Sequence, residues 1–334
     1  MFPYPILVCD IGGTNARFGY ASAAGEPLHT IAPMGTAEFG GLADACRAAV
    51  PGSGTAPASL IVCAAGPVKG KSVELTNISW RINGPDIAAE LDLKQGLLLN
   101  DFEALALTLP VLDVQDLRPI GLAGPAGSQA ELRLILGPGT GLGVAALLSA
   151  DGYHHALASE AGHMELAPAD GAEAELFAHV ETPQGRLSAE TLISGPGLVR
   201  LHRARGRHKG AASSQSALNP AEITRLALRD PLGPEADSIR HFWRLTARFA
   251  GDMALAFAAR GGVTLAGGIL PKLTDFLDEK EFRNVFEHKA PMGRLAAAIS
   301  TRLLLNDQAA LRGMRAIADA PHKYRIDFEK RCWL

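Results

Sequence analysis

The sequence predicts an α/β protein with two layered domains. Three observations lead to this expectation. Apolar strand-like runs alternate with helical patterns through the first hundred residues. A chain of 334 residues is long enough for two domains. Two similar glycine-rich strand–turn–strand units stand in the two halves of the chain.

The first part of the chain ends at a proline. Leu109-Pro110 terminates a helical pattern, and a Gly/Pro-rich passage that runs to Ser128 marks the expected domain boundary. Before this boundary we expect strands at 5–11, 16–22, 59–64 and 96–99, and helices near 38–50, 84–92 and 101–109.

The second part begins with a glycine hairpin and continues mainly as helices. A short strand from Val263 to Ala266 interrupts them and ends in a glycine pair. We expect strand and loop over 153–168, and helices at 171–180, 188–204, 220–229, 236–259 and 308–318. In the helix at 236–259, four apolar residues recur at helical spacing and should face the core, namely Phe242, Leu245, Phe249 and Met253.

Composition excludes several classes of protein. A net charge of −3 implies no general attraction to nucleic acid or membranes, and no run of about 18 apolar residues predicts a membrane span. The 4 cysteines are scattered, so neither a zinc site nor a disulfide framework is expected, and Cys9 and Cys63 should be core residues. The N-terminus enters the first strand without a secretory signal, so we expect a cytoplasmic location. The basic stretch from Arg200 to Gly210 lacks aromatics and is interpreted as a solvated helix end and mobile loop.

The first candidate site is a turn between two expected strands. The run Ile6–Cys9 leads into Asp10-Ile11-Gly12-Gly13-Thr14-Asn15, and a second strand follows. Glycines let backbone N–H groups approach phosphate oxygens, and a carboxylate suits the water shell of magnesium. No Gly-Lys-Ser/Thr follows, which excludes the P-loop. Phosphate binding is one interpretation, and an ordinary hairpin turn is the other.

A similar turn recurs in the second half of the chain. Leu132–Leu136 leads into Gly137-Pro138-Gly139-Thr140-Gly141-Leu142-Gly143, and another strand follows. Gly139-Thr140 matches Gly13-Thr14, while Leu136 stands where the first unit has Asp10. Two such hairpins suit a polyphosphate held from two sides. Because the chain has 36 glycines, a chance repeat is the alternative.

Two polar residues follow another buried strand. The run Gly96–Leu99 ends in Asn100 and Asp101, and a helical pattern begins behind them. Ligand sites in α/β sheets lie at the carboxyl ends of strands, so this pair is a candidate site. Helix capping is the alternative, although it explains only one of the two residues.

Three further polar residues and a glycine pair are candidates. Glu160 and His163 have the Glu-x-x-His spacing of di-iron sites, but a single copy interrupted by glycine favours a loop that bonds the hydroxyls of a polyol. A purely structural loop remains open. Glu190 follows Ser188 at a helix start, where capping and the helix dipole also explain both residues. Gly267-Gly268 either admits a flat ring or ribose or makes a simple turn.

In this order, the motifs resemble the bacterial-type glucokinases of the actin/hexokinase/Hsp70 ATPase superfamily, over roughly residues 5–318. The related ROK sugar kinases and repressors match less well, because no zinc-binding cysteines follow His163. The chain departs from the family pattern at Ala161, where glycine is usual, and it extends past the usual end near 320. Further matching motifs are Ala65-Gly66-Pro67, Thr76-Asn77 with Trp80, Ser194-Gly195-Pro196-Gly197-Leu198 and Ala266-Gly267-Gly268-Ile269.

The resemblance implies two ribonuclease-H-like (actin-like ATPase) domains flanking a cleft. The smaller would hold 1–110 plus about 300–320 and the larger 111–299, followed by an extension at 321–334. Asp101 would be the catalytic base, and Asp10 would lie near magnesium through water. The implied glucose-binding residues are Asn100, Glu160, His163 and Glu190. The implied nucleotide-binding residues are Asp10, Gly12, Gly13, Thr14, Asn15, Gly139, Thr140, Gly141, Gly267 and Gly268.

We therefore expect a glucokinase that uses ATP and Mg²⁺, performs the first step of glycolysis, binds no nucleic acid or membrane, and forms the dimer usual in the family. A broader hexose kinase acting on mannose or N-acetylmannosamine is one alternative, and ADP or polyphosphate remains open as the donor. A sugar-sensing ATP-binding protein without catalysis is another, although the presence of both Asp10 and Asp101 argues against it.

Overall fold

Two units make up the computed structural model, which describes residues 2–50, 52, 54–66, 68–75, 78, 80–121, 131–210 and 218–333. Several sequence expectations lie outside the described residues, namely those at Pro67, Thr76-Asn77 and Ser128 and the loop expected after Gly210. The first unit holds Met1–Asp113, Leu147–Ala158 and Asn306–Leu334, and the second holds Val114–Ala146 and Ser159–Leu305.

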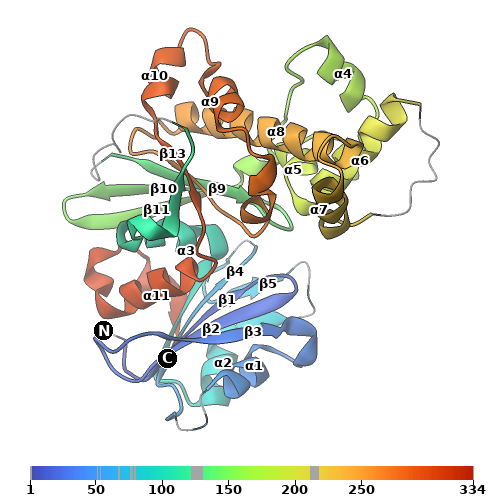
Figure 1. Cartoon of the computed structure of the whole chain (residues 1–334). Helices are drawn as coiled ribbons and strands as arrows, with labels where there is room; N and C mark the ends of the chain where they lie inside the picture. The colour runs from blue at the N-terminus through green and yellow to red at the C-terminus, as the bar shows by residue number, and fades with distance from the viewer. Residues whose placement is uncertain are drawn as a thin grey trace. The chain divides into compact units, whose positions relative to one another are not determined.

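The sheet of the first unit has the strand order β14-β7-β4-β1-β2-β3. Figure 1 labels its strands β4, β1, β2 and β3. β1, β2 and β3 pair antiparallel, β4 and β7 run parallel to β1, and the two-residue β14 pairs antiparallel with β7. The four strands expected here are confirmed to within one residue at each end. β3 was missed because most of its side chains are exposed and show no apolar alternation. The strands are β1 (Ile6–Ile11), β2 (Asn15–Ala21), β3 (His29–Gly35), β4 (Ser59–Ala64), β7 (Gln95–Asn100) and β14 (Cys332–Trp333).

Helices and a small hairpin complete the first unit. The described residues of β1, β4 and β7 are almost wholly buried, and Cys9 and Cys63 are core residues as expected. α11 packs closely on α3, since a Cβ at Gly313 would lie 2.0 Å from Thr108 Oγ1. The elements are α1 (Leu42–Ala49), α2 (Gly84–Leu91), α3 (Asp101–Thr108), α11 (Ala309–Asp319), α12 (Phe328–Arg331), β5 (Ser72–Glu74) and β6 (Arg81–Asn83).

The second sheet has the order β11-β10-β9-β12-β13-β8. Both sheets contain a glycine hairpin beside parallel strands that follow later in the chain. In the second sheet the hairpin joins β9 and β10, and the parallel strands are β12 and β13. The boundary between the two units passes through β10. The strands are β8 (Leu117–Pro119), β9 (Arg133–Pro138), β10 (Leu142–Ala150), β11 (Tyr153–Ser159), β12 (Val263–Leu265) and β13 (Thr301–Leu304).

One expected helix of the second unit is wrong. The pattern at 188–204 forms two helices, because the Ser194 hydroxyl accepts a hydrogen bond from Gly197 N at 3.0 Å and starts a new helix. Pro196, which has no N–H, fits only the first turn of that helix. The helices are α4 (Gly171–Phe177), α5 (Ala189–Leu192), α6 (Gly195–His208), α7 (Pro220–Arg229), α8 (Pro234–Ala256), α9 (Glu279–Glu287) and α10 (Gly293–Ala298).

The interior of the second unit is built around α8. Its residues Phe242, Leu245, Phe249 and Met253 are buried, which confirms the expected core face. Across the described residues, no helix is both long enough and apolar enough to cross a bilayer. The basic stretch lies largely within α6, where Arg203 and Arg207 pair with Glu181 and Arg205 pairs with Asp237. These ion pairs agree with a solvated helix end.

Candidate active site

The turn between β1 and β2 is a tight hairpin. Gly12 N donates a hydrogen bond to Asn15 O at 2.9 Å, and Thr14 O accepts one from Thr36 N at 3.0 Å. The side chains of Thr14 and Asn15 are exposed, and Asn15 Nδ2 donates to Thr14 Oγ1 at 3.2 Å. The hairpin therefore presents a glycine pair and two polar side chains at the end of the sheet.

Asp10 lies beside this hairpin in a mostly buried position. Its register partners are Arg17 on β2 and Cys63 on β4. Arg17 Nη1 lies 3.6 Å from Asp10 Oδ2, and Cys63 Sγ donates to Asp10 Oδ1 at 3.4 Å. Burial raises the pKa of Asp10, although the nearby Arg17 opposes the shift. Arg17 also lies 3.6 Å from Asp307 Oδ2, so it bridges two carboxylates.

Asn100 and Asp101 divide two tasks at the junction of β7 and α3. Asn100 caps the helix: its Oδ1 accepts from Phe102 N at 3.0 Å and from Glu103 N at 3.1 Å. Glu103 Oε2 in turn accepts from Asn100 N at 3.3 Å, which completes a capping box. The capping alternative is thus correct for Asn100, while Asp101 is not required for the cap and accepts from Phe102 N through Oδ1 at 2.9 Å.

Asp101 has a strongly shifted pKa. Burial, together with the negative charge of Asp10, raises the pKa to about 6, although hydrogen bonds from backbone N–H groups and from Asn100 lower it. The structure thus brings Asp10 and Asp101 close enough to interact at the same end of the sheet. A carboxylate with this pKa is ionised at neutral pH and is a stronger base than an exposed aspartate.

The second hairpin, between β9 and β10, is held by Glu190. Gly139 N donates to Gly141 O at 2.8 Å, and Leu142 N donates to Glu190 Oε2 at 2.8 Å. A Cβ at Gly141 would lie 2.4 Å from Glu190 Oε2, so a larger residue there would displace the Glu190 carboxylate, whereas a Cβ at Gly139 would have no atom within 4 Å. The turn therefore has one packed glycine and one that a ligand can approach.

Glu160, His163 and Glu190 lie next to one another. A 3-10 turn, Ala161–His163, carries the first two, in agreement with the expected loop. His163 Nε2 is 3.8 Å from Glu160 Oε2, and His163 Nδ1 is 3.9 Å from Glu190 Oε1. No described residues form a group of three metal-ligating side chains. The side chains of Glu160 and His163 are 77% and 50% exposed, so they can reach a ligand.

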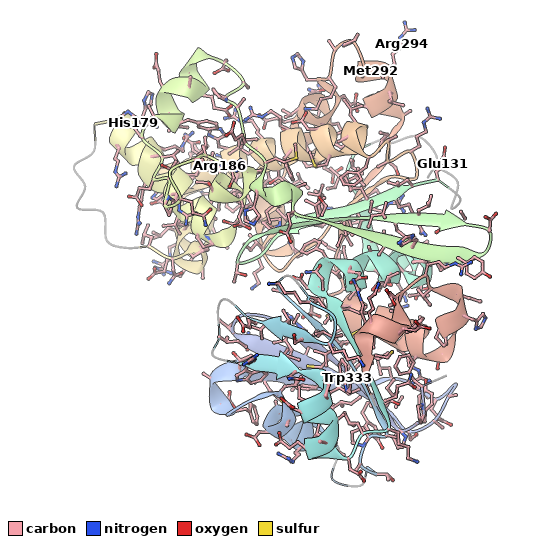
Figure 2. The ribbon with its side chains drawn as sticks, turned by 180° about the vertical axis from the view of Figure 1, so that it is seen from behind. Glu131, His179, Arg186, Met292, Arg294 and Trp333 are labelled. Carbon is pink, nitrogen blue, oxygen red and sulfur yellow. The ribbon has the colours of Figure 1, made fainter. Side chains whose placement is uncertain are left out.

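Neighbouring residues fix the shape of this loop. Ser188 caps α5 by accepting from Thr191 N at 3.3 Å, which leaves Glu190 free to bond the hairpin. Arg186, labelled in Figure 2, donates to His163 O at 3.0 Å. The methyl group of Ala161 is buried in the core, so the departure from the family pattern is accommodated by packing.

Gly267 and Gly268 differ in their surroundings. Gly267 has φ +90°, and a Cβ there would lie 2.3 Å from Pro138 O. Close packing against the end of β9 therefore explains this glycine. Gly268 is exposed, and a Cβ there would have no atom within 4 Å. Contact with a nucleotide remains a prediction for both.

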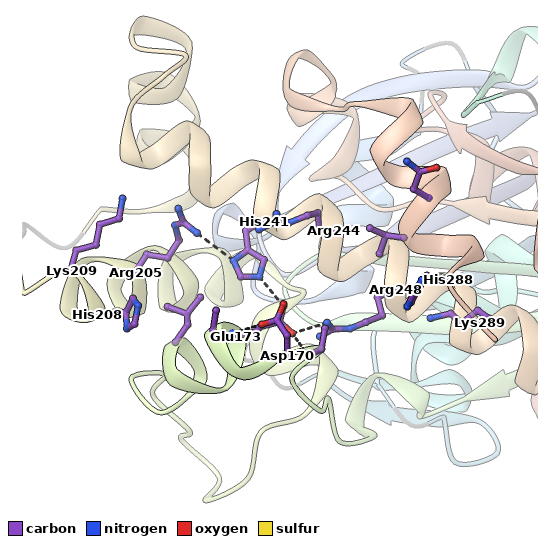
Figure 3. A pocket seen from close by; sticks show the side chains of 15 residues that line it. Asp170, Glu173, Arg205, His208, Lys209, His241, Arg244, Arg248, His288 and Lys289 are labelled. Carbon is purple, nitrogen blue, oxygen red and sulfur yellow. Dashed lines mark hydrogen bonds and ion pairs between the residues drawn. The ribbon is translucent and has the colours of Figure 1, made fainter. Parts of the chain in front are cut away.

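A cavity of about 690 Å³ lies in the second unit, among α4, α6, α8 and α9 (Figure 3). None of the predicted site residues lines it. At its wall Glu173 accepts from His241 Nε2 at 3.0 Å and from Arg248 Nη1 at 2.6 Å. Burial opposes ionisation of Glu173, but these bonds and one from Ala169 N lower its pKa to about 2. The cluster is an ion-paired support that joins α4 to α8.

The structure groups the predicted residues within each unit. Asp10, the first hairpin, Asn100 and Asp101 share one end of the first sheet. In the second unit, Glu190 links the second hairpin to the Glu160–His163 loop. Sequence reasoning missed Arg17, although the hairpin register places it opposite Asp10. It also missed Asp307, for which the sequence carries no local signal.

Comparison with known proteins identifies the family of this chain. The glucokinase family model matches residues 7–321. The glucokinase of Agrobacterium fabrum is 39% identical over 332 residues, which are 99% of this chain and 96% of that protein. A crystal structure of glucokinase from an Antarctic psychrotroph has a TM-score of 0.78 at 31% identity, over 94% of this chain and 98% of that one.

A more distant structure shows the fold alone. A ROK family glucokinase from Streptomyces griseus, solved with glucose and AMPPNP, has a TM-score of 0.64 at 20% identity, over 94% of this chain and 99% of that one. The expected α/β fold of the actin-like ATPase type is confirmed by these neighbours. The chain therefore belongs to the glucokinase family of ATP-dependent sugar kinases.

Proposed function

We propose that this protein transfers the γ-phosphoryl group of MgATP to the 6-hydroxyl of D-glucose, giving glucose 6-phosphate and ADP. The junction of Asn100 and Asp101 carries the proposal. Because Asn100 caps α3, the Asp101 carboxylate is not required for the cap, and its pKa of about 6 suits a base at neutral pH. Family membership supports the reaction and the class of substrate.

Asp101 would act on the attacking hydroxyl. As the bond from the sugar O6 to the γ-phosphorus forms, the proton of O6 passes to an Asp101 carboxylate oxygen. The bond from the γ-phosphorus to the β–γ bridging oxygen breaks, and ADP leaves. Such a transfer depends mainly on positioning and on charge stabilisation. General-base catalysis contributes about 10²–10⁴-fold in rate.

The two hairpins would hold the phosphates. Backbone N–H groups at Gly12–Asn15 and Gly139–Gly141 are the proposed donors to the phosphate oxygens. The donor set at Asp10 fits a cation, because burial raises the pKa of this carboxyl and a nearby positive charge would favour its ionised form. Asp10 would hold Mg²⁺ through water. When bound, Mg²⁺ supplies charge neutralisation on the phosphates.

Four polar residues would bond the other sugar hydroxyls. Asn100 uses Oδ1 for the helix cap and donates from Nδ2 to Gly66 O at 3.2 Å, so the other N–H of Nδ2 would serve the sugar. Glu190 uses Oε2 for the second hairpin, so its Oε1 would face the sugar together with His163 and Glu160. A sugar that lacks a bonded hydroxyl would leave these groups unpaired, which is costly. This set therefore favours glucose over its deoxy analogues and epimers.

We further infer that the protein acts in the cytoplasm as a homodimer, at the first step of glycolysis. The product, glucose 6-phosphate, supports the last inference. Light scattering of the purified protein at micromolar concentration tests the dimer, for which a mass near 70 kDa is expected from the 35.0 kDa chain. A mass of one chain would contradict it.

The proposed reaction is tested by the formation of sugar phosphate across a panel of sugars and donors, together with the release of ADP when ATP is the donor. The panel holds glucose, mannose and N-acetylmannosamine with ATP, ADP or polyphosphate, in the presence or absence of Mg²⁺. ADP release that needs glucose, ATP and Mg²⁺ together supports the proposal. Equal rates with mannose or N-acetylmannosamine would show a broader hexose kinase. Glucose binding without ADP release would show a sensor instead.

A further inference from the structure

The C-terminal segment 328–333 is built into the first unit. β14 pairs with β7 through Trp333 opposite Gly96 and Cys332 opposite Leu97. The indole of Trp333 is 1% exposed (Figure 2), and it occupies the space where a Cβ at Gly84 or Gly96 would stand, 2.3 and 2.1 Å from the ring. Two glycines in α2 and β7 therefore make room for this tryptophan, and the segment becomes an edge of the sheet.

Arg331 reaches from this segment to the start of α3. Its Nη1 donates to Glu103 Oε1 at 2.5 Å and to Oε2 at 2.6 Å. The Glu103 side chain is only 9% exposed and that of Arg331 is 28% exposed, so the pair is mostly shielded from water. Charge-assisted hydrogen bonds are strong, and a buried carboxylate without its partner is costly.

Glu103 connects this ion pair to the predicted base. Its Oε2 also accepts from Asn100 N, and its own N–H donates to Asn100 Oδ1, so the same residue closes the capping box around Asp101. β7, which delivers Asn100, is the strand that pairs with β14. The C-terminal segment thus supports both elements that meet at Asp101.

We propose that Arg331 is a positioning residue for phosphoryl transfer, which through Glu103 holds the Asn100–Asp101 junction in its catalytic geometry. This inference rests on the proposed function, because it assumes that Asp101 is the base. A base displaced by about 1 Å can lose on the order of 10²-fold in rate. The C-terminal segment, which follows the end of the family-model match at residue 321, would then be part of the catalytic support.

The test compares two opposite charge changes. R331M leaves the Glu103 carboxylate buried and unpaired two residues from Asp101, so the pKa of Asp101 should rise. E103Q leaves Arg331 unpaired, so the pKa of Asp101 should fall. Asp10 on β1 and Cys63 on β4 also act on Asp101, and both are unchanged in these variants. The double variant R331M/E103Q removes both charges of the ion pair, so the net charge beside Asp101 is the same as in wild type.

The measurement is the pH profile of kcat/KM for glucose at saturating MgATP, whose acid limb reports the base in the enzyme form that binds glucose. We expect R331M to lose about tenfold in kcat. Its acid limb should move to higher pH by a few tenths of a pH unit. E103Q should move the acid limb to lower pH, and the double variant should return the limb to its wild-type position. R331K should recover most of the rate. The matched control is K330M, which removes an adjacent charge that is 80% exposed and should change neither quantity.

Thermal unfolding of each variant separates positioning from folding. If R331M unfolds earlier but keeps its kcat and its acid limb well below the unfolding temperature, the role is structural and the inference is overturned. If R331M does not fold, E103Q and the double variant decide the question. The inference then requires that the acid limb of E103Q moves to lower pH and that the limb of the double variant returns to its wild-type position. D101N is assayed beside them. A fully active D101N overturns the assignment of Asp101 as the base, on which this inference rests, whereas an inactive D101N with an unaffected R331M overturns only the role of Arg331.

Discussion

Replacing Asp10 by asparagine is expected to move the acid limb of the pH profile to lower pH. The limb belongs to Asp101, whose pKa is raised to about 6 by burial and then by the charge of Asp10. A base works only when ionised, so kcat/KM for glucose should fall about tenfold per pH unit below the pKa. Removing the Asp10 charge lowers the pKa, while burial keeps it above the usual range of aspartate.

The size of the effect follows from the ionised fraction. With a pKa of about 6, roughly a tenth of Asp101 is ionised at pH 5. A shift of about one unit, which is typical of a nearby like charge, would raise this fraction at pH 5 to about a half. The ratio of kcat/KM at pH 5 to that at pH 7.5 should therefore increase from about 0.1 to about 0.5.

The ratio is informative because D10N should also lower the plateau, through loss of the proposed contact with the water shell of Mg²⁺. D10N, D307N and wild type are assayed at saturating MgATP by coupled ADP release. D307N is the matched control: Asp307 is 66% exposed and reaches Asp10 through Arg17, so its removal should shift the limb less. An unchanged ratio in D10N, or a limb that moves to higher pH, would refute the electrostatic coupling of Asp10 and Asp101.

Three further outcomes are expected. G139A adds a methyl group at the turn glycine that the proposed phosphate approaches and should raise the KM for ATP about tenfold, whereas the Cβ of G141A meets Glu190 Oε2 at 2.4 Å, the movable end of a flexible side chain, and should raise the KM less, which initial rates will show. Urea unfolding of E173Q should show a free energy of unfolding about 3 kcal/mol below that of wild type at pH 7. This difference should shrink as the pH falls from about 4.5 towards 2, because the pKa of Glu173 is lowered to about 2 and protonation of Glu173 removes its stabilisation of the wild type. D101N should unfold at a higher temperature than wild type at pH 7 but not at pH 4. The reason is that the pKa of Asp101 is raised, so its ionised form destabilises the folded state. An equal difference in unfolding temperature at both pH values would contradict this.

The regular elements were predictable where burial is periodic. The runs in β1, β4 and β7 are apolar because both faces of these strands are covered, and the helical spacing of Phe242 and Leu245 in α8 was clear for the same reason. β3 has mostly exposed side chains and left no pattern. The division of 188–204 depended on one serine cap, a local signal that competed with a continuous helical pattern.

The site was predictable as a set of residues and less so as a set of bonds. Asp101 followed from its place at a strand end, but the sequence left open which of Asn100 and Asp101 caps the helix. The bond from Leu142 N to Glu190 joins residues 48 apart, and Arg331 meets Glu103 across 228 residues. Sequence patterns record local periodicity, so contacts of this kind appear only when the chain is folded.

The central claim is that Asp101 is the base, and the turnover of D101N tests it most directly. Glucose-dependent ADP release by D101N is compared with wild type at pH 7.5, and glucose binding is measured by calorimetry on the same samples. We expect turnover to fall by about 10²–10⁴-fold while glucose binding stays measurable. Turnover within a few fold of wild type would contradict the account.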